Sequence, residues 1–208
     1  MGEFTLKAEP FLDRYERDFG SVSIKELHQQ AIVSFAIPNG CETKAEKTLN
    51  KVFGVACPKV GNSVLSKDGS ARLMRLGADQ LFCLLSNQQD THSAHLVMNQ
   101  KFGQDIYTTD QSDVWVCVEV SGTQTRKALE RICAIDLHPD HFTIASIART
   151  TMEHLGTIIL RSAENTYVLL SASSSAHSFL HALETSGQNT KEWTPRIKAL
   201  SGGICILG

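Results

Sequence analysis

The spacing of apolar residues along the chain switches between the two-residue period of a strand and the roughly 3.6-residue period of a helix. Residues 31–37 form a β-branched and aromatic run that Pro38-Asn39-Gly40 closes, which is typical of a strand ending in a turn. Residues 42–53 then place apolar side chains three or four positions apart, and Gly54 stands where a helix would end. We therefore expect a strand followed by an amphipathic helix.

The next segment predicts a hairpin, a helix and a strand. Two short apolar runs, 71–76 and 80–85, flank a Gly-Ala-Asp turn, as in a β-hairpin. Asp90 can cap a helix that carries several apolar residues on one side, and residues 106–109 are typical of a strand. The order strand, helix, strand, strand, helix, strand is that of a ferredoxin-like plait.

The second half of the chain repeats this theme. Residues 114–120 alternate valines with Trp115, Cys117 and Glu119, which makes them the clearest strand in the sequence. Residues 123–132 follow as a helix, and Ser173-Ser174-Ser175 can cap a last helix. Three further strands are expected between these two helices, at residues 149–153, 157–161 and 166–171.

Antiparallel sheets covered by helices are the simplest arrangement for this alternation, so the predicted fold class is α+β with two ferredoxin-like, or plait-like, halves. We expect an irregular N-terminal arm (1–23), a first half (24–110), a second half (111–186) and a C-terminal arm (187–208). The residues expected in the second core are Val114, Val116, Val118, Leu129 and Ile132.

Composition places the chain among ordinary globular proteins. It has 208 residues, of which 42% are hydrophobic and 20% charged, and its net charge is −2, so the basic surface of a nucleic-acid-binding protein is not expected. The longest apolar runs are too short for a membrane span, and the first residues lack the pattern of a secretory signal. We expect a cytoplasmic protein that binds neither nucleic acid nor membrane.

Cysteines and histidines offer few candidates for chemistry. The six cysteines form no C-x-x-C pair, which favours reduced thiols over a zinc site or a disulfide framework. His138 and His141 lie three residues apart around Pro139, where a turn is a better interpretation than a metal site. Surface positions are likewise favoured over metal binding for two helical pairs, His92 with His95 and His177 with His181.

The usual motifs for cofactor phosphates and for nucleophilic serines, G-x-G-x-x-G, G-x-x-x-x-G-K-[ST] and G-x-S-x-G, do not occur. We therefore expect no catalytic, cofactor-binding or metal residues in this chain, and no cofactor bound by it alone.

Three aromatic residues are candidates for a partner interface: Trp115, Phe142 and Phe179. Trp115 projects to the face of its strand opposite the neighbouring valines, because side chains alternate along a strand. Such a two-faced strand is either buried under layers on both sides or docked against another chain. Core placement is the alternative interpretation for all three rings.

The order of segments from Asp110 to Leu183 resembles the gamma subunit family of heterotetrameric sarcosine oxidase. The resemblance covers D-Q-S-D at 110–113, S-G at 121–122, a helix ending in Cys133, D-L-H-P at 136–139, A-R-T at 148–150 and a serine-led final helix. The segment L-G-A-D-Q-L-F-C-L at 76–84 is similar to an earlier stretch of that family.

The resemblance implies a fold like that of the folate-binding aminomethyltransferase domain. It also implies a non-catalytic gamma subunit in a flavoenzyme that oxidatively demethylates sarcosine to glycine together with alpha, beta and delta subunits. In that family FAD, FMN, NAD, tetrahydrofolate and zinc belong to the other subunits, and no catalytic residue is assigned to gamma.

Two alternatives stay open at this point. One is a folate-binding aminomethyltransferase-like or tRNA-modifying-type protein acting alone, for which a K-G-C-Y-like segment would be expected; Asn39-Gly40-Cys41-Glu42 is a fragment of one. The other is a free-standing plait that binds a small ligand between its halves. The sequence also departs from the gamma pattern, since Phe179 and His181 stand where that family often has tryptophans.

Overall fold

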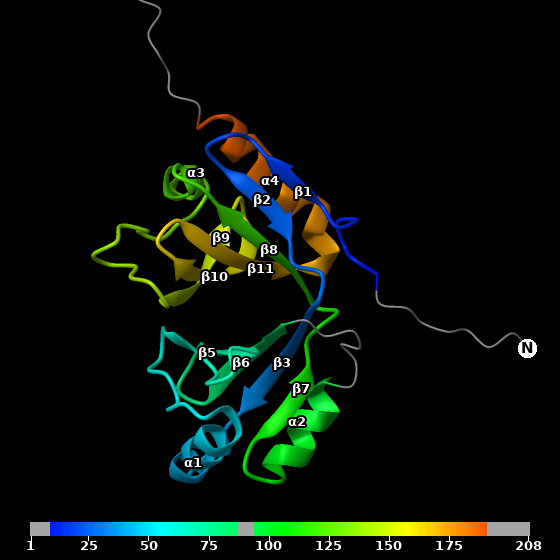
Figure 1. Ribbon diagram of the computed structural model, residues 1–208, viewed down its shortest axis with the longest axis vertical. Helices are drawn as coiled ribbons and strands as arrows, with labels where there is room; N and C mark the ends of the chain where they lie inside the picture. Colours follow the sequence, from blue (N-terminus) through cyan, green and yellow to red (C-terminus); the bar gives the residue numbers. More distant parts are fainter. Residues whose placement is uncertain (1–8, 87–93, 191–208) are drawn as a thin grey trace, which may run out of the picture.

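Two antiparallel sheets face one another, and helices cover their outer sides (Figure 1). The computed structural model describes residues 9–86 and 94–190. In spatial order the first sheet contains β4 (Ser63–Leu65), β5 (Ala71–Arg75), β6 (Gln80–Ser86), β3 (Gln30–Ala36) and β7 (Tyr107–Asp110). The second contains β1 (Glu16–Asp18), β2 (Ser23–Glu26), β8 (Trp115–Ser121), β11 (Thr166–Ala172), β10 (Leu155–Ala163) and β9 (Ile147–Met152).

The helices lie in two pairs at the two ends of the view in Figure 1. The pair over the first sheet is α1 (Glu42–Phe53) and α2 (Ala94–Phe102). The pair over the second is α3 (Thr125–Glu130) and α4 (Ala176–Gln188), the latter preceded by the 3₁₀ turn η1 (Ser173–Ser175). The predicted α+β class with antiparallel sheets is confirmed. Among the helices of the described residues, none combines the length and the apolar character needed to cross a bilayer.

The two sheets share one topology. In the first, β7, β3, β6 and β5 lie side by side, which is the strand order of a ferredoxin-like plait. In the second, β8, β11 and β10 correspond to β3, β6 and β5, and β2 takes the place that β7 has in the first sheet. The fourth strand of the second plait therefore comes from the N-terminal part of the chain.

This arrangement corrects the expectation of an irregular N-terminal arm. β1 lies within residues 1–23 and pairs with β2, and β2 pairs with β8 from Ser23 opposite Ser121 to Glu26 opposite Val118. β2 thus belongs to the second sheet, although it precedes every strand of the first. Whether the segments 24–110 and 111–186 form separate domains stays a prediction.

The central strands are apolar on both faces because each is covered twice. Alternate residues of β3 and β6 face α1 and α2, and those of β8 and β11 face α3 and α4. The remaining residues meet between the sheets in an inter-sheet cluster of Ile32, Met74, Phe82, Leu84, Cys117, Ile147, Ile158, Leu160, Val168 and Leu170. Burial of each large aliphatic or aromatic side chain of this kind is worth roughly 1.5–3 kcal/mol.

Local signals placed most elements within a few residues. α1 ends as expected at Gly54, which has φ 70° and donates its N–H to the carbonyl of Asn50 at 2.8 Å. Val114 was wrongly expected in the core: β8 begins at Trp115, and Val114 is 46% exposed. β4 was not expected. The predicted cap Asp90, together with His92 and residues 191–208, lies outside the described residues.

Candidate functional site

Two crossings carry the chain between the sheets, side by side in Figure 1. Residues 27–29 lead from β2 to β3, and residues 111–114 lead from β7 to β8. Leu27 donates its N–H to the carbonyl of Cys117 at 2.8 Å, and Gln111 donates its N–H to the carbonyl of Ile32 at 2.8 Å. Each crossing is thus held against a strand of the sheet that it leaves. We call this region the seam.

A cavity of about 280 Å³ lies at the seam. Its walls come from residues 9–14, from both crossings and from the start of β8, so three distant parts of the sequence build it. The polar or aromatic side chains that line it include those of Arg14, Glu26, His28 and Trp115.

Glu26 is the most deeply buried charged residue of this wall, at 3% exposure. Its carboxylate accepts the N–H groups of Leu12 at 3.0 Å and Arg14 at 2.8 Å. A buried carboxylate requires such partners because it has lost its hydration. Both Asp13 (φ 54°) and Arg14 (φ 60°) are left-handed, so Glu26 fastens a tight turn that forms one wall of the cavity.

Cys117 also lines the cavity, but its thiol is poorly suited to nucleophilic chemistry. Burial raises the pKa of Cys117 to about 12, and the carboxylates of Glu119 and Glu26 act in the same direction. The thiolate is the nucleophilic form of cysteine, so a thiol protonated at neutral pH is a weak nucleophile. Cys117 therefore contributes an apolar, unreactive side chain to the wall of the cavity.

Trp115 lies where the seam meets the inter-sheet cluster. Its ring packs edge to face on Phe82, and its indole Nε1–H donates to Oε1 of Gln111 at 3.3 Å. The residue is half-buried, and part of it faces the cavity. The ring of Trp115 is therefore covered by the opposite sheet, which is one of the two interpretations given for its strand face. Part of the residue stays exposed.

Phe142 and Phe179 are core residues, which removes them from the candidate partner surface. Phe179 is a fully buried residue of α4, and Phe142 is 6% exposed. The ring of Phe142 stacks on Tyr167, with 6.5 Å between centroids and an interplanar angle of 9°. Rings enclosed in this way have no surface to offer a partner, so Trp115 alone of the three can take part in docking.

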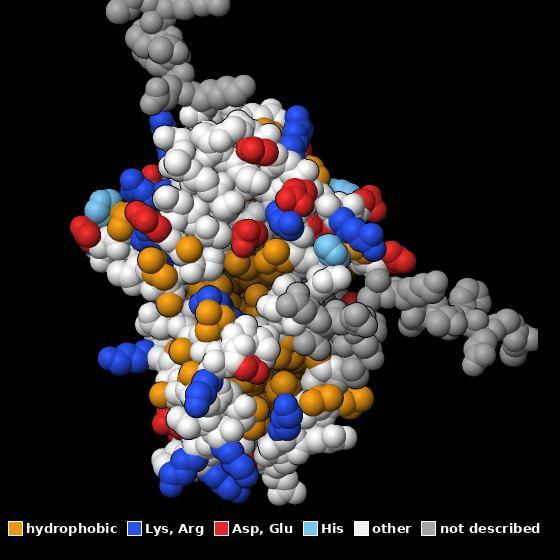
Figure 2. Space-filling view, in the orientation of Figure 1, with side chains coloured by type: hydrophobic (Ala, Val, Ile, Leu, Met, Phe, Trp, Pro, Cys, Tyr) orange, Lys and Arg blue, Asp and Glu red, His pale blue; other side chains and the backbone are white. Residues whose placement is uncertain are grey.

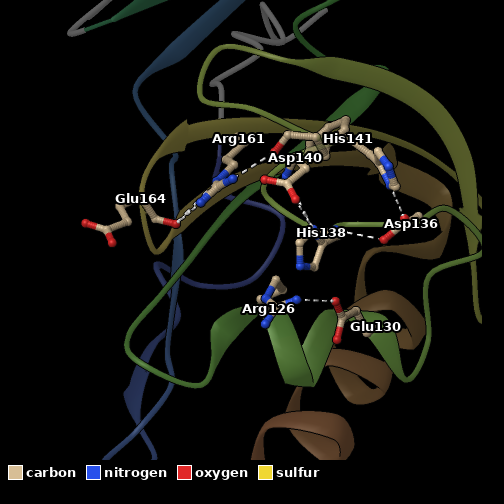
Figure 3. Close-up of polar contacts among 9 residues, drawn as sticks. Arg126, Glu130, Asp136, His138, Asp140, His141, Arg161 and Glu164 are labelled. Atoms are coloured by element: carbon tan, nitrogen blue, oxygen red, sulfur yellow. Dashed lines mark hydrogen bonds and ion pairs between the residues drawn. The ribbon is translucent and has the colours of Figure 1, made fainter.

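His138 and His141 lie in an exposed turn (Figure 3). Nδ1 of His141 is 2.5 Å from Oδ2 of Asp136, and the N–H of His138 donates to Oδ1 of Asp136 at 2.8 Å. Asp140 approaches His138 at 3.4 Å. The hydrogen bond with His141 lowers the pKa of Asp136, and the same bond raises the pKa of His141. These contacts close a turn.

Arg161 is a structural residue that the sequence did not single out. It is 6% exposed, and its guanidinium donates to the carbonyl of Phe142 at 2.8 Å and to that of Glu164 at 2.8 Å (Figure 3). It thereby fastens the loop before β9 to the turn between β10 and β11. A charged residue inside an otherwise apolar strand was the signal that could have revealed it.

The other histidines are dispersed. His95 on α2 lies 3.8 Å from the carboxylate of Asp110, and His177 and His181 are exposed on α4. Across residues 9–86 and 94–190, no group of three His, Cys, Asp or Glu side chains is arranged to hold a metal ion.

Comparison with known proteins gives a match in structure. No protein-family model matches the chain, and no curated protein matches it in sequence. A chain of heterotetrameric sarcosine oxidase from Corynebacterium sp. U-96, in complex with pyrrole 2-carboxylate, matches with a TM-score of 0.68 and 19% identity. The match covers 80% of this chain and 83% of that chain.

The chain has the fold of this sarcosine oxidase chain. Glycine cleavage system aminomethyltransferase T from Bartonella henselae also matches, with a TM-score of 0.58 and 15% identity over 76% of this chain. The match covers 44% of the aminomethyltransferase, so the chain spans less than half of that protein. The predicted aminomethyltransferase-like fold is therefore confirmed, and the seam lies between the two plaits of that fold.

Proposed function

We propose that this chain is a non-catalytic, gamma-type subunit of a heterotetrameric sarcosine oxidase. The observation that carries the proposal is the extent of the structural match, which covers four fifths of both chains. The likeness is therefore between two small chains of similar size, rather than between this chain and one domain of a large enzyme.

On this proposal the redox chemistry belongs to the partner subunits. The alpha, beta and delta chains would hold FAD, FMN, NAD, tetrahydrofolate and zinc, and the cytoplasmic complex would oxidatively demethylate sarcosine to glycine. The described seam supports an accessory role for this chain. Its buried carboxylate, Glu26, is occupied by backbone N–H groups, and its thiol, Cys117, is protonated at neutral pH.

A second candidate is a folate-binding aminomethyltransferase-like or tRNA-modifying-type protein that acts alone. The match to aminomethyltransferase T and the seam cavity favour it. The short span of that match counts against it, because the chain corresponds to less than half of the matched protein.

Co-expression tests the proposal. We expect the tagged chain to bring down a large flavin-binding alpha subunit in equimolar amount, together with beta and delta, at physiological salt. We also expect the chain alone to be colourless and to show no sarcosine-dependent oxygen uptake. Recovery of only the free chain in the presence of the three partners would contradict the subunit role.

The same preparation separates the two candidates. Calorimetric titration of the free chain with tetrahydrofolate should give no heat of binding if folate belongs to a partner subunit. Saturable binding by the free chain, combined with failure to assemble, would favour the second candidate.

A further inference from the structure

Three exposed apolar residues lie in the edge strand β4, in the segment before it and in the loop before β9, and the one in β4 pairs with Arg72. Val60 is 53% exposed, Leu65 47% and Ile144 55%. We call these three residues, together with Arg72, the edge patch. Figure 2 shows apolar side chains gathered in the hollow between the two layers, with a basic side chain among them.

Backbone contacts join the segments that carry the edge patch. Leu65 is the cross-strand neighbour of Arg72 in the β4–β5 pair. Ser63 links β4 to the loop before β9, because its N–H and its hydroxyl both donate to the carbonyl of Ala145, at 2.8 and 3.0 Å. Beside Val60, Gly61 accepts the N–H of Ile147 at 2.9 Å. Val60 and Ile144 therefore flank one junction, which also contains an antiparallel bridge between Asn62 and Ser146.

The guanidinium of Arg72 is partly buried, and few polar partners compensate for the water that it has lost. It is half-buried, and within the described part of the chain its guanidinium has one hydrogen-bond acceptor, the hydroxyl of Ser63 at 3.2 Å. No carboxylate of the described residues lies within 4.0 Å of it. Burial alone lowers the pKa of Arg72. The charge has thus lost part of its hydration and gained only a neutral partner, which is unfavourable unless a carboxylate joins it.

Ala145 shows that the junction is held in a costly conformation. Its φ of 73° is left-handed, where a residue with a Cβ is disfavoured. Three hydrogen bonds keep it there: its N–H donates to the carbonyl of Arg161 at 2.8 Å, and its carbonyl accepts the two bonds from Ser63. Backbone strain of this kind concentrates at binding sites. Here the strained residue is Ala145, and the residue before it, Ile144, has an exposed side chain.

We propose that the edge patch docks a partner chain that presents a carboxylate within an apolar surface, and that this carboxylate pairs with Arg72. The inference rests on the proposed function, with the large flavin-binding subunit as the partner. Arginine with surrounding apolar side chains is the composition of an interface hot spot, and a guanidinium binds a carboxylate through two parallel hydrogen bonds.

Charge favours a different chain over a second copy of this one. In a two-fold symmetric dimer the same patch occupies both sides of the interface. The edge patch contains one charged residue, Arg72, and the exposed residue before Val60 is Lys59. Two copies would therefore bring like charges together, whereas a partner carboxylate supplies the missing opposite charge.

Co-purification with the large subunit tests the proposal with two patch variants and two matched controls. Arg72→Leu removes the charge and keeps an apolar surface, and Ile144→Asp places a carboxylate at an exposed site. Lys47→Leu on α1 is the control for charge removal. Leu96→Asp on α2, where Leu96 is 54% exposed, is the control for the new carboxylate.

We expect each patch variant to reduce the recovered large subunit at least about tenfold, with the controls at the wild-type level. Arg72→Leu should at the same time leave the Tm of the free chain unchanged or higher, since it removes a poorly compensated charge. If Arg72 had a purely structural role, Arg72→Leu would lower both the recovery of the large subunit and the Tm of the free chain. A photo-crosslinking residue placed at position 144 should join to the large subunit, and one at position 96 should not.

The results separate the two proposals. Wild-type recovery with both patch variants, or crosslinking from position 96 and not from 144, overturns the edge patch and leaves the subunit role intact. A patch-dependent homodimer in light scattering also overturns it, in favour of a second copy. Failure of the wild-type chain itself to recover the large subunit removes the proposed function, and the edge patch proposal with it.

Discussion

Phe82 and Trp115 belong to different sheets, and their rings meet edge to face with centroids 5.8 Å apart and planes inclined at 70°. Phe82 lies in the inter-sheet cluster, and Trp115, the first residue of β8, packs against that cluster. Edge-to-face pairs of this kind are favoured over direct stacking and add about 0.5–1.5 kcal/mol to the burial of the rings. The contact joins the seam to the shared core of the two sheets.

Phe82→Ala should therefore lower the free energy of unfolding by about 3–5 kcal/mol, because it opens a cavity between the sheets. Urea denaturation measures this change. Tyr107→Ala is the control, since Tyr107 is 63% exposed and its removal should cost no more than about 0.5 kcal/mol. In a Trp193→Phe background, where Trp115 is the remaining tryptophan, Phe82→Ala should also shift the emission to longer wavelength. An unchanged denaturation midpoint would show that the sheets do not pack through Phe82.

Glu26→Gln should loosen the turn at Leu12 and Arg14. The amide replaces one acceptor oxygen with an N–H₂ group that faces a backbone N–H, so a hydrogen bond to a charged acceptor, worth about 1.5–3 kcal/mol, is lost. Limited proteolysis should then cleave near residues 12–14 faster than in wild type. Glu16→Gln is the control: it breaks only the exposed ion pair with Lys25, worth about 0–1 kcal/mol. Equal cleavage rates in the two variants would contradict the role of Glu26.

Gly122→Ala should be far more damaging than Gly20→Ala. Both glycines are left-handed, with φ of 123° and 92°. A Cβ at Gly122 would lie 2.4 Å from the carbonyl oxygen of Ser21, whereas a Cβ at Gly20 would meet nothing within 4 Å. We expect Gly20→Ala to cost about 1–2 kcal/mol from backbone strain alone. Gly122→Ala should cost more, because the new Cβ must also displace the segment that leads into β2. Similar Tm values for the two variants would show that the segment leading into β2 does not pack against Gly122.

The pair of His141 and Asp136 should make the turn at 136–141 sensitive to pH. Because the pKa of His141 is raised, its contribution to stability is complete below the ordinary histidine value of about 6.5 and is lost as the pH rises through the folded pKa. Because the pKa of Asp136 is lowered, its contribution is present above about 3.9 and is lost as the pH falls through the folded pKa. The turn should be most stable between these limits.

Asp136→Asn tests this directly. An NMR titration of His141 should show its midpoint at lower pH in the variant, because the carboxylate that favours the imidazolium is gone. The control is His138→Asn, which leaves the carboxylate of Asp136 beside His141. A midpoint that does not move in Asp136→Asn would mean that the two side chains do not pair in solution.

Features that depend on neighbours in the chain could be predicted from the sequence. The run at 31–37, the helix ending at Gly54 and the alternation in 115–120 each reflect the local geometry of one element, and the structure contains them as β3, α1 and β8. The α+β class followed from the order of those elements. β1 and β4, of three residues each, were too short to produce a period.

The seam and the edge patch could not be predicted in this way. Each brings together segments far apart in the sequence: Glu26 with Leu12 and Cys117 at the seam, and Ser63 with Ala145 at the patch. A pattern shows that a residue is apolar or charged, but it does not show which element lies opposite. For that reason Phe142 and Phe179 were candidates for the surface until the fold enclosed them, and Arg72 was one arginine among many.

The sequence by itself therefore determined the elements, their order and the two-faced apolar character of the central strands, because these depend on the local backbone and on side-chain alternation. Only the tertiary structure decided that β2 completes the second sheet, that Trp115 keeps an exposed part and that Arg72 is half-buried with a neutral partner. The physical reason is that hydrogen-bond pairing between strands, and the loss of water from a side chain, depend on groups that approach through space from elsewhere in the chain.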